Sequence, residues 1–282
     1  MPGSGSPTAS RLELGTLLRN LRTGRGWTVQ QVAELLDFSP SKVSRLETGH
    51  RGASARDIRD LCDLYEVEAV LRQRLNDLAA EGKQRTLWQP LKLPYLRYTD
   101  LESSAISIQD YALTLVPGLL QTTDYAREVV RAAVPHWPPD VVEQRVEGRL
   151  IRQQMLRAEN SPKFEAVVDE TVLRRVVGGA PVMRAQMQLL LEASRLATVD
   201  LRVISLSAGP LPAGNNKFII LRFATPEVPA VVFVEGLTGD LYLDDTKDLT
   251  LYSQAFTTAM DMAMTADATR DLIGAMIRRY ES

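Results

Sequence analysis

The sequence predicts a small all-α domain of five helices followed by an α+β domain with a mostly antiparallel sheet. Three observations carry this prediction. The 282 residues suffice for two domains of roughly 150 residues each. Apolar residues recur at helical spacing through residues 11–82. After residue 200, short apolar runs alternate with Gly, Pro and Asn, as in strands joined by turns.

The expected division of the chain follows from these patterns. Residues 1–10 are rich in Gly, Ser and Pro and are interpreted as a disordered tail. The helical domain covers residues 11–82, a polar linker covers 83–94, and the α+β domain covers 95–282.

Composition excludes several classes of protein. With 45% hydrophobic and 24% charged residues, the chain has the composition of an ordinary globular protein. The sequence contains no run of about 18 apolar residues, so no membrane span is predicted. The first ten residues lack the pattern of a secretory signal. The single cysteine, Cys62, excludes an intrachain disulfide and indicates a cytoplasmic location.

Charge is unevenly distributed along the chain. The whole sequence has a formal net charge of −2. Between residues 11 and 56, however, eight Lys and Arg residues face only four acidic ones. A basic N-terminal segment on an acidic chain is typical of a small nucleic-acid-binding head attached to a domain that does not touch nucleic acid.

The first two predicted helices have clear apolar stripes and ends. The first helix has leucines at positions 14, 17, 18 and 21 and ends before Gly24 and Gly26. Thr28 caps the second helix, whose inner face consists of Val29, Val32, Ala33 and Leu36. Ala33 is small and allows another helix to cross closely.

A turn and a third short helix follow. Asp37 can adopt the left-handed backbone that such a turn requires. Ser39 and Pro40 then restart the chain as a helix, with a hydroxyl cap followed by proline at the first helical position. Val43 and Leu46 point inward, which leaves a polar outer face consisting of Ser41, Lys42, Ser44 and Arg45.

Two further helices complete the head. Ser54 and Asp57 form a capping signature for a fourth helix, with an inner face of Ile58, Leu61, Cys62 and Tyr65. A fifth helix is expected over residues 68–81. Five short helices, with the third polar outside, suit a geometry that places one helix in the major groove of DNA.

The segment TVQQVAELLDFSPSKVSRLETGHRG resembles the Cro/cI-type (XRE-like) helix-turn-helix family. The resemblance implies a transcriptional regulator that binds a double-stranded DNA operator. It places Ser41 and Arg45 at base edges and divides Ser39, Lys42 and Ser44 between bases and phosphates. Phosphate contacts are implied for the start of the second helix and the end of the third, through Thr28, Gln30, His50 and Arg51.

The same resemblance implies a buried structural ion pair between Arg22 and Glu47. Two positions depart from the family pattern. Asp37 replaces the usual turn glycine, and Val29 replaces a glutamine that would hold a phosphate. Because one short helix buries too little surface to be specific alone, we expect a homodimer that binds two inverted half-sites.

The remaining chain predicts alternating helices and strands. Strands are expected over residues 106–116, 164–168, 201–206, 218–223, 231–234 and 241–243. Helices are expected over residues 123–134, 139–159, 170–177, 181–197, 249–264 and 268–280. These elements form one α+β domain.

Four segments carry a second resemblance: TLVPGLLQTTDYAR, VVDETVLRRVVGG, PVMRAQMQLLLEAS and VFVEGLTGDLYLDD. They are similar to the C-terminal domain of a group of actinobacterial regulators described as antitoxin-like or WhiJ-like. This implies a domain that senses a small-molecule effector or docks a small protein encoded by a neighbouring gene. The alternative is an antitoxin-like protein that neutralises its partner by contact, with DNA binding serving autoregulation.

Catalysis, cofactors and metals are not expected. The carboxylate groupings worth weighing are Asp169 with Glu170 and the trio Asp240, Asp244 and Asp245. Each lies beside a predicted helix, where capping is a sufficient role. The second domain has one histidine, His136, and no cysteine, so these residues supply no nucleophile–base pair.

Overall fold

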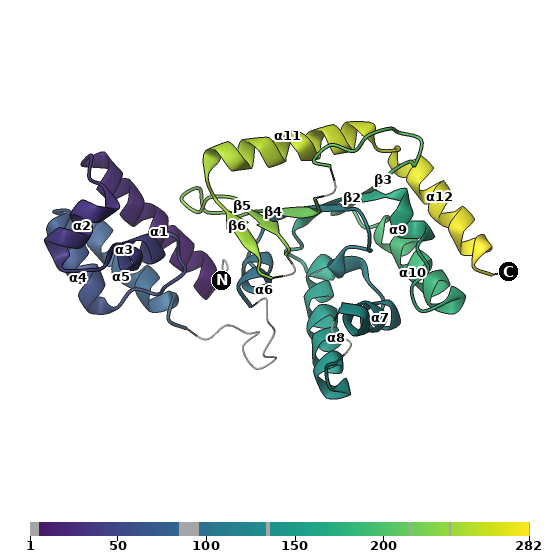
Figure 1. Cartoon of the computed structure of the whole chain (residues 1–282), viewed down its shortest axis with the longest axis horizontal. Coiled ribbons are helices and arrows are strands. Elements are labelled where there is room, and N and C mark those ends of the chain that lie inside the picture. Colours follow the sequence, from purple (N-terminus) through teal and green to yellow (C-terminus); the bar gives the residue numbers. More distant parts are fainter. Residues whose placement is uncertain (1–5, 85–95, 134–135, 215, 237, 282) are drawn as a thin grey trace. The chain divides into compact units, whose positions relative to one another are not determined.

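The computed structural model describes residues 6–84, 96–133, 136–214, 216–236 and 238–281 (Figure 1). Contacts divide the chain into two compact units. The first unit extends to Ser104 and includes residues 223–229, and the second contains residues 105–222 and 230–282. The predicted linker over residues 83–94 lies almost wholly outside the described residues.

The first unit is helical. Its elements are α1 (Pro7–Gly24), α2 (Val29–Leu36), α3 (Pro40–Glu47), α4 (Ala55–Leu64), α5 (Ala69–Glu81) and α6 (Leu96–Glu102). The five helices expected from the sequence are α1 to α5. Their apolar stripes meet in one core that includes Leu18, Val32, Ile58 and Leu75.

Helix α1 begins earlier than the sequence indicated. Ser6 caps it by accepting a hydrogen bond from the Ala9 amide, and Pro7 occupies the first turn. Thr8, Ala9 and Ser10 are buried. The prediction of a disordered tail is therefore wrong for residues 7–10, because a cap, a proline and burial fix them as helix. Residues 1–5 lie outside the described part of the chain.

Helix α6 was not expected at all. It lies in the range that the sequence analysis assigned to the second domain, yet it bonds to α1. The carboxylate of Asp100 accepts a hydrogen bond from the Thr8 amide at 2.8 Å, and Ser104 Oγ accepts one from the Ser6 amide at 3.1 Å. Both contacts lie within the first unit.

The second unit is an α+β fold around a six-stranded mixed sheet with the order β3-β2-β1-β4-β5-β6. The strands are β1 (Ser107–Ala112), β2 (Lys163–Asp169), β3 (Val199–Ile204), β4 (Phe218–Arg222), β5 (Val231–Val234) and β6 (Leu241–Leu243). The strands expected at residues 231–234 and 241–243 are confirmed with those bounds.

The sheet is antiparallel in one half and parallel in the other. The pairs β1–β4, β4–β5 and β5–β6 are antiparallel, so the expectation of a mostly antiparallel sheet holds approximately. The pairs β1–β2 and β2–β3 are parallel. Parallel neighbours need crossover connections, which here contain helices. The crossover helices are α7 (Thr123–Ala133), α8 (Pro139–Gln153), α9 (Glu170–Arg174) and α10 (Ala180–Ala193).

Helices cover both faces of this sheet, as Figure 1 shows. Helix α11 (Thr246–Met262) crosses one face and buries Phe256 and Ala259. The crossover helices lie on the other face, and α12 (Ala266–Arg279) packs against β3 and α10. In the part of the chain that the structure describes, no helix has both the length and the apolar character needed to cross a bilayer.

Candidate DNA-binding surface

The α2–turn–α3 segment is fixed by local hydrogen bonds. Thr28 and Gln31 form a capping box, in which each side chain accepts a hydrogen bond from the other residue's backbone amide. Asp37 ends α2 in the left-handed region, with φ of 53° and ψ of 41°. The left-handed backbone expected at Asp37 is thus confirmed. Ser39 then caps α3 by accepting a hydrogen bond from the Lys42 amide at 3.1 Å.

Arg45 lies on the exposed face of α3 and is held there by its neighbour one turn earlier. Its Nε and Nη2 donate to Ser41 Oγ at 3.0 and 2.7 Å. Ser44 is also exposed. The hydroxyl of Ser41 orients the guanidinium without neutralising its charge. The outer face of α3 therefore presents an oriented cation between small hydroxyl side chains.

Lys42 is directed elsewhere. Its ammonium nitrogen lies 2.6 Å from a carboxylate oxygen of Asp57 and 3.1 Å from the centre of the Phe38 ring. Burial by itself would raise the pKa of Asp57, but hydrogen bonds from Lys42 and Ser54 lower it on balance. The charge of Lys42 is thus engaged within the head, where it ties α3 to α4.

A buried ion pair joins α1 to the end of α3. Arg22 donates from Nε and Nη2 to the two carboxylate oxygens of Glu47, at 2.6 and 2.8 Å. Their side chains are only 12% and 5% exposed. The hydrogen bond to Glu47 raises the pKa of Arg22. A third Arg22 nitrogen donates to the Trp27 carbonyl at 2.8 Å, so the guanidinium also fixes the chain entering α2.

Two glycines, Gly15 and Gly49, set how closely α1 approaches α3, a role that was not predicted from the sequence. A Cβ atom at Gly15 would lie 2.5 Å from the Glu47 carbonyl oxygen. One at Gly49, where φ is +66°, would lie 3.1 Å from the backbone of Arg11 and Leu12. The signal for Gly15 was a glycine inside a helical stripe, which often marks a close backbone approach.

The remaining predicted phosphate contacts lie around the ends of α2 and α3. Gln30 is exposed and donates to Glu34 at 3.0 Å. Arg51 is exposed, and its backbone amide donates to the Arg45 carbonyl at 3.1 Å. His50 Nδ1 lies 3.0 Å from Thr48 Oγ1. Thr28, Ser39, Ser41, Ser44, Arg45, His50 and Arg51 are thus brought to the surface of one small unit, whereas Lys42 is half-buried.

Arg97 of α6 also reaches the end of α3, a contact that no sequence pattern indicated. Its guanidinium contacts His50 Nε2 and donates to the Thr48 carbonyl at 3.3 Å. Arg97 lies 47 residues beyond His50 in the chain, with the residues 85–95 that precede α6 outside the described part. Only the three-dimensional structure brings the two side chains together.

The carboxylates weighed in the second domain have structural partners. Asp169 accepts from the Thr171 amide at 2.8 Å, and Asp245 caps α11 by accepting from the Lys247 amide at 2.8 Å. Burial alone would raise the pKa of Glu170, but hydrogen bonds from the Leu206 amide and Arg174 lower it on balance. Among the described residues, no group of three or more His, Cys, Asp or Glu side chains could hold a metal ion.

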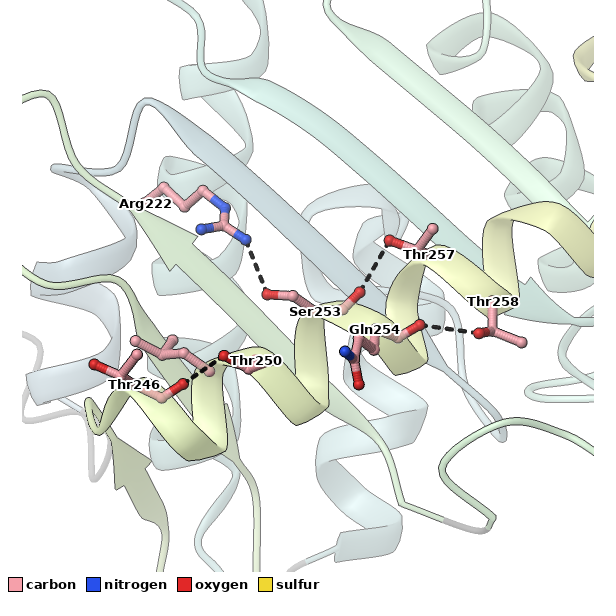
Figure 2. Close-up of a pocket in the computed structure, with 8 residues that line it drawn as sticks. Arg222, Thr246, Thr250, Ser253, Gln254, Thr257 and Thr258 are labelled. Carbon is pink, nitrogen blue, oxygen red and sulfur yellow. Dashed lines mark hydrogen bonds between the residues drawn. The ribbon is translucent and has the colours of Figure 1, made fainter.

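A shallow hollow follows the outer side of α11 (Figure 2). Its lining is almost free of charge: Arg222, Thr246, Leu249, Thr250, Ser253, Gln254, Thr257 and Thr258. Arg222 donates to Ser253 Oγ at 3.1 Å. Thr250, Thr257 and Thr258 donate their hydroxyl hydrogens to carbonyls one turn earlier in their own helix.

Comparisons with known proteins agree with this division. Residues 13–75 match the family model described as "Helix-turn-helix domain". A curated relative, the "Competence pilus inhibition repressor" of Acinetobacter baylyi (strain ATCC 33305 / BD413 / ADP1), is 28% identical over 89 residues, covering 30% of this chain and 78% of the relative. No solved structure matches. Residues 95–275, well over half of the chain, match the model "Domain of unknown function (DUF5753)", and the chain therefore belongs to that family, with a helix-turn-helix domain ahead of it.

Proposed function

We propose that this protein is a sequence-specific transcriptional regulator that binds an operator in double-stranded DNA through α3. One observation carries the proposal: Arg45 stands on the exposed face of α3 with its guanidinium oriented by Ser41. Arginine is the side chain best suited to bind guanine through two hydrogen bonds in the major groove. The helix-turn-helix match and the similarity to a named repressor support the same function.

The contacts would divide into base and phosphate contacts. Arg45 and Ser41 face base edges, with Ser44 beside them. The side chains of Thr28 and Ser39 serve as helix caps, so phosphates would be met at these helix starts by backbone amides and the helix dipole. Exposed Arg51 supplies a phosphate contact. Lys42 acts within the head through Asp57.

The mode of assembly and regulation belongs to the same proposal. A single head per chain and the short outer face of α3 favour a homodimer on two inverted half-sites. The second unit would receive a small-molecule effector or a small partner protein, in the cytoplasm and without catalysis. The similarity to antitoxin-like and WhiJ-like actinobacterial regulators supports a partner protein. An antidote that acts by contact alone would still protect growth when Arg45 is replaced.

Selection of bound sequences from a random DNA pool tests the proposal. We expect the full chain to enrich a site with two inverted half-sites, and footprinting to show protection of both. The mass of the complex should correspond to two chains per site. Enrichment of no sequence would contradict DNA recognition. Protection of a single half-site by one chain would contradict the dimer.

A further inference from the structure

Helix α6 bonds to two segments of the helical head that lie far apart in the sequence, the start of α1 and the end of α3. At one end, the buried carboxylate of Asp100 accepts a hydrogen bond from the Thr8 amide at the start of α1. The first turn of α1 has no acidic residue of its own, so Asp100 supplies the negative charge that a helix N-terminus favours. At the other end, Arg97 reaches the residues that follow α3.

The contacts of Arg97 define the hydrogen-bonding state of His50. A guanidinium can only donate, so His50 Nε2 accepts from Arg97 and the ring proton lies on Nδ1. That proton is donated to Thr48 Oγ1 across 3.0 Å. The Thr48 hydroxyl in turn donates to the Ser44 carbonyl at 2.9 Å. A continuous hydrogen-bond chain thus runs from α6 to the last turn of α3.

This arrangement changes the role expected for His50. Both of its ring nitrogens are engaged by the protein, one by Arg97 and one by Thr48. In this state the imidazole has no N–H left for a phosphate oxygen. His50 therefore connects Arg97 to α3 and fixes the turn that carries Arg51.

Helix α6 is also connected directly to the central part of the sheet. Only four residues separate its end at Glu102 from the start of β1 at Ser107. Strand β1 pairs with both β2 and β4, at the point where the parallel and antiparallel halves of the sheet meet. The chain therefore passes from α6 of the first unit into β1 of the second through a very short segment.

We propose that Arg97 is a positioning residue for DNA binding and that α6 is the element through which the second unit controls α3. With α6 docked, the end of α3 and the Arg51 turn are ordered before DNA arrives. Release of α6 would disorder them and weaken binding. The inference rests on the proposed binding of DNA through α3.

The test is a double-mutant cycle between Arg97 and His50 in the full chain, with the selected operator as the probe. We expect Arg97→Ala to weaken operator binding by roughly tenfold, within the range of coupling changes seen for residues that touch no ligand. In the His50→Ala background the same change should have less than about a threefold further effect, because the hydrogen-bond chain through His50 is already broken and only the bond from Arg97 to the Thr48 carbonyl remains. Arg184→Ala removes an exposed arginine paired with Glu281 and should leave affinity unchanged.

The outcomes separate this inference from the proposed function. If Arg45→Ala abolishes specificity while Arg97→Ala binds like the parent, the positioning role is overturned and DNA binding through α3 stands. Equal losses of affinity from Arg97→Ala in both backgrounds would also overturn it, since Arg97 would then act independently of His50. If Arg45→Ala changes nothing, the proposed function fails. A second variant, Asp100→Asn, weakens the bond between α6 and the start of α1. If this variant folds and binds the operator with unchanged affinity, the proposal is contradicted, even where Arg97→Ala does not fold.

Discussion

Helices α3 and α11 both present polar outer faces rich in hydroxyl groups, and they differ in how those groups are used. On α11, Thr250, Thr257 and Thr258 donate to carbonyls of their own helix. On α3, the Ser41 hydroxyl accepts from Arg45 and orients a cation toward solvent. The two helices therefore differ in the oriented arginine on α3, and not in how many hydroxyl groups they expose. The arginine is what makes the outer face of α3 a candidate DNA-binding surface.

The inner sides of the two helices differ as well. Helix α11 is anchored by apolar side chains, with Phe256 and Ala259 buried on the sheet. Helix α3 is anchored by Val43 and Leu46 and, in addition, by the ion pair of Glu47 with Arg22. Because this buried ion pair has two parallel hydrogen bonds, it fixes the orientation of α3 relative to α1 as well as the distance between the two helices. The orientation of the α3 outer face thus depends on a charge that α1 supplies.

The largest effect should come from Glu47→Gln. Removing the carboxylate charge leaves Arg22 buried beside a neutral amide, which costs roughly 3 kcal/mol of unfolding free energy. Urea unfolding followed at Trp27, with Trp88 and Trp137 replaced by Phe, reports on the head alone. Glu34→Gln is the control, because Glu34 is exposed on α2 and accepts a hydrogen bond from the side chain of Gln30. Equal losses in the two variants would contradict the role of the buried pair.

Gly15→Ala should follow in size. The new methyl group would meet the Glu47 carbonyl oxygen at 2.5 Å, so α1 and α3 must separate, at a cost of about 1–3 kcal/mol. Gly24→Ala is the matched control, since nothing lies within 4 Å of its Cβ position. We expect the first variant to lose both stability and operator affinity, and the second to keep both. A stable Gly15→Ala variant with normal affinity would show that the close approach is not required.

Arg45→Ala tests the outer face itself. Loss of a two-pronged contact to guanine should weaken specific binding by about 1–3 kcal/mol and relax preference at one base pair. Arg222→Ala removes the arginine beside α11 and should not change DNA binding. Both are measured by titrating the operator and its single-base variants. If Arg45→Ala weakened binding to every sequence equally, Arg45 would be a phosphate contact. If Arg222→Ala weakened DNA binding, the surface beside α11 would also take part in it, and the contrast drawn between α3 and α11 would be wrong.

The sequence predicted the head well because its information is local. Caps such as Thr28, Ser39 and Ser54, together with apolar stripes, define each helix within a few residues. The turn at Asp37 was expected for the same reason. Where contacts are distant, the prediction failed: Arg97 meets His50 across 47 positions, and no local pattern encodes that distance.

Lys42 shows a second kind of limit. The resemblance implied a contact between Lys42 and DNA, which stays a prediction, and no local pattern indicated that this long side chain also reaches a neighbouring helix. Here the Lys42 ammonium lies beside Asp57 and the Phe38 ring.

In the sheet, short apolar runs predicted where the strands lie, but they did not predict which neighbouring strands are parallel. The helices between β1, β2 and β3 were the signal for parallel pairing.

The Lys42–Asp57 pair gives a pH dependence with a defined sign. The pKa of Asp57 is lower in the folded head than its ordinary value of 3.8. Its contribution to stability is therefore fully present above that value and is lost as the pH falls through it toward the lowered pKa. We expect Asp57→Asn to flatten this loss in unfolding experiments at decreasing pH, and Lys42→Met to do the same. An unchanged acid profile in both variants would show that the pair is not a source of stability.

The smallest expected effects come from removing one hydroxyl from each helix, and they bear most directly on the comparison. Thr257→Val keeps the shape of the side chain and removes a hydroxyl that donates to the Ser253 carbonyl of its own helix. We expect the free energy of unfolding to change by less than about 0.5 kcal/mol and the operator affinity to stay the same. Ser41→Ala frees the guanidinium of Arg45, and we expect specific binding to fall by about 0.5–1.5 kcal/mol with head stability retained. Preference at the base pair that Arg45→Ala affects should relax, because an arginine without its tether loses more freedom on binding. A Ser41→Ala variant with full affinity and specificity would mean that Arg45 needs no orientation, and the distinction between the two faces would then depend on charge alone.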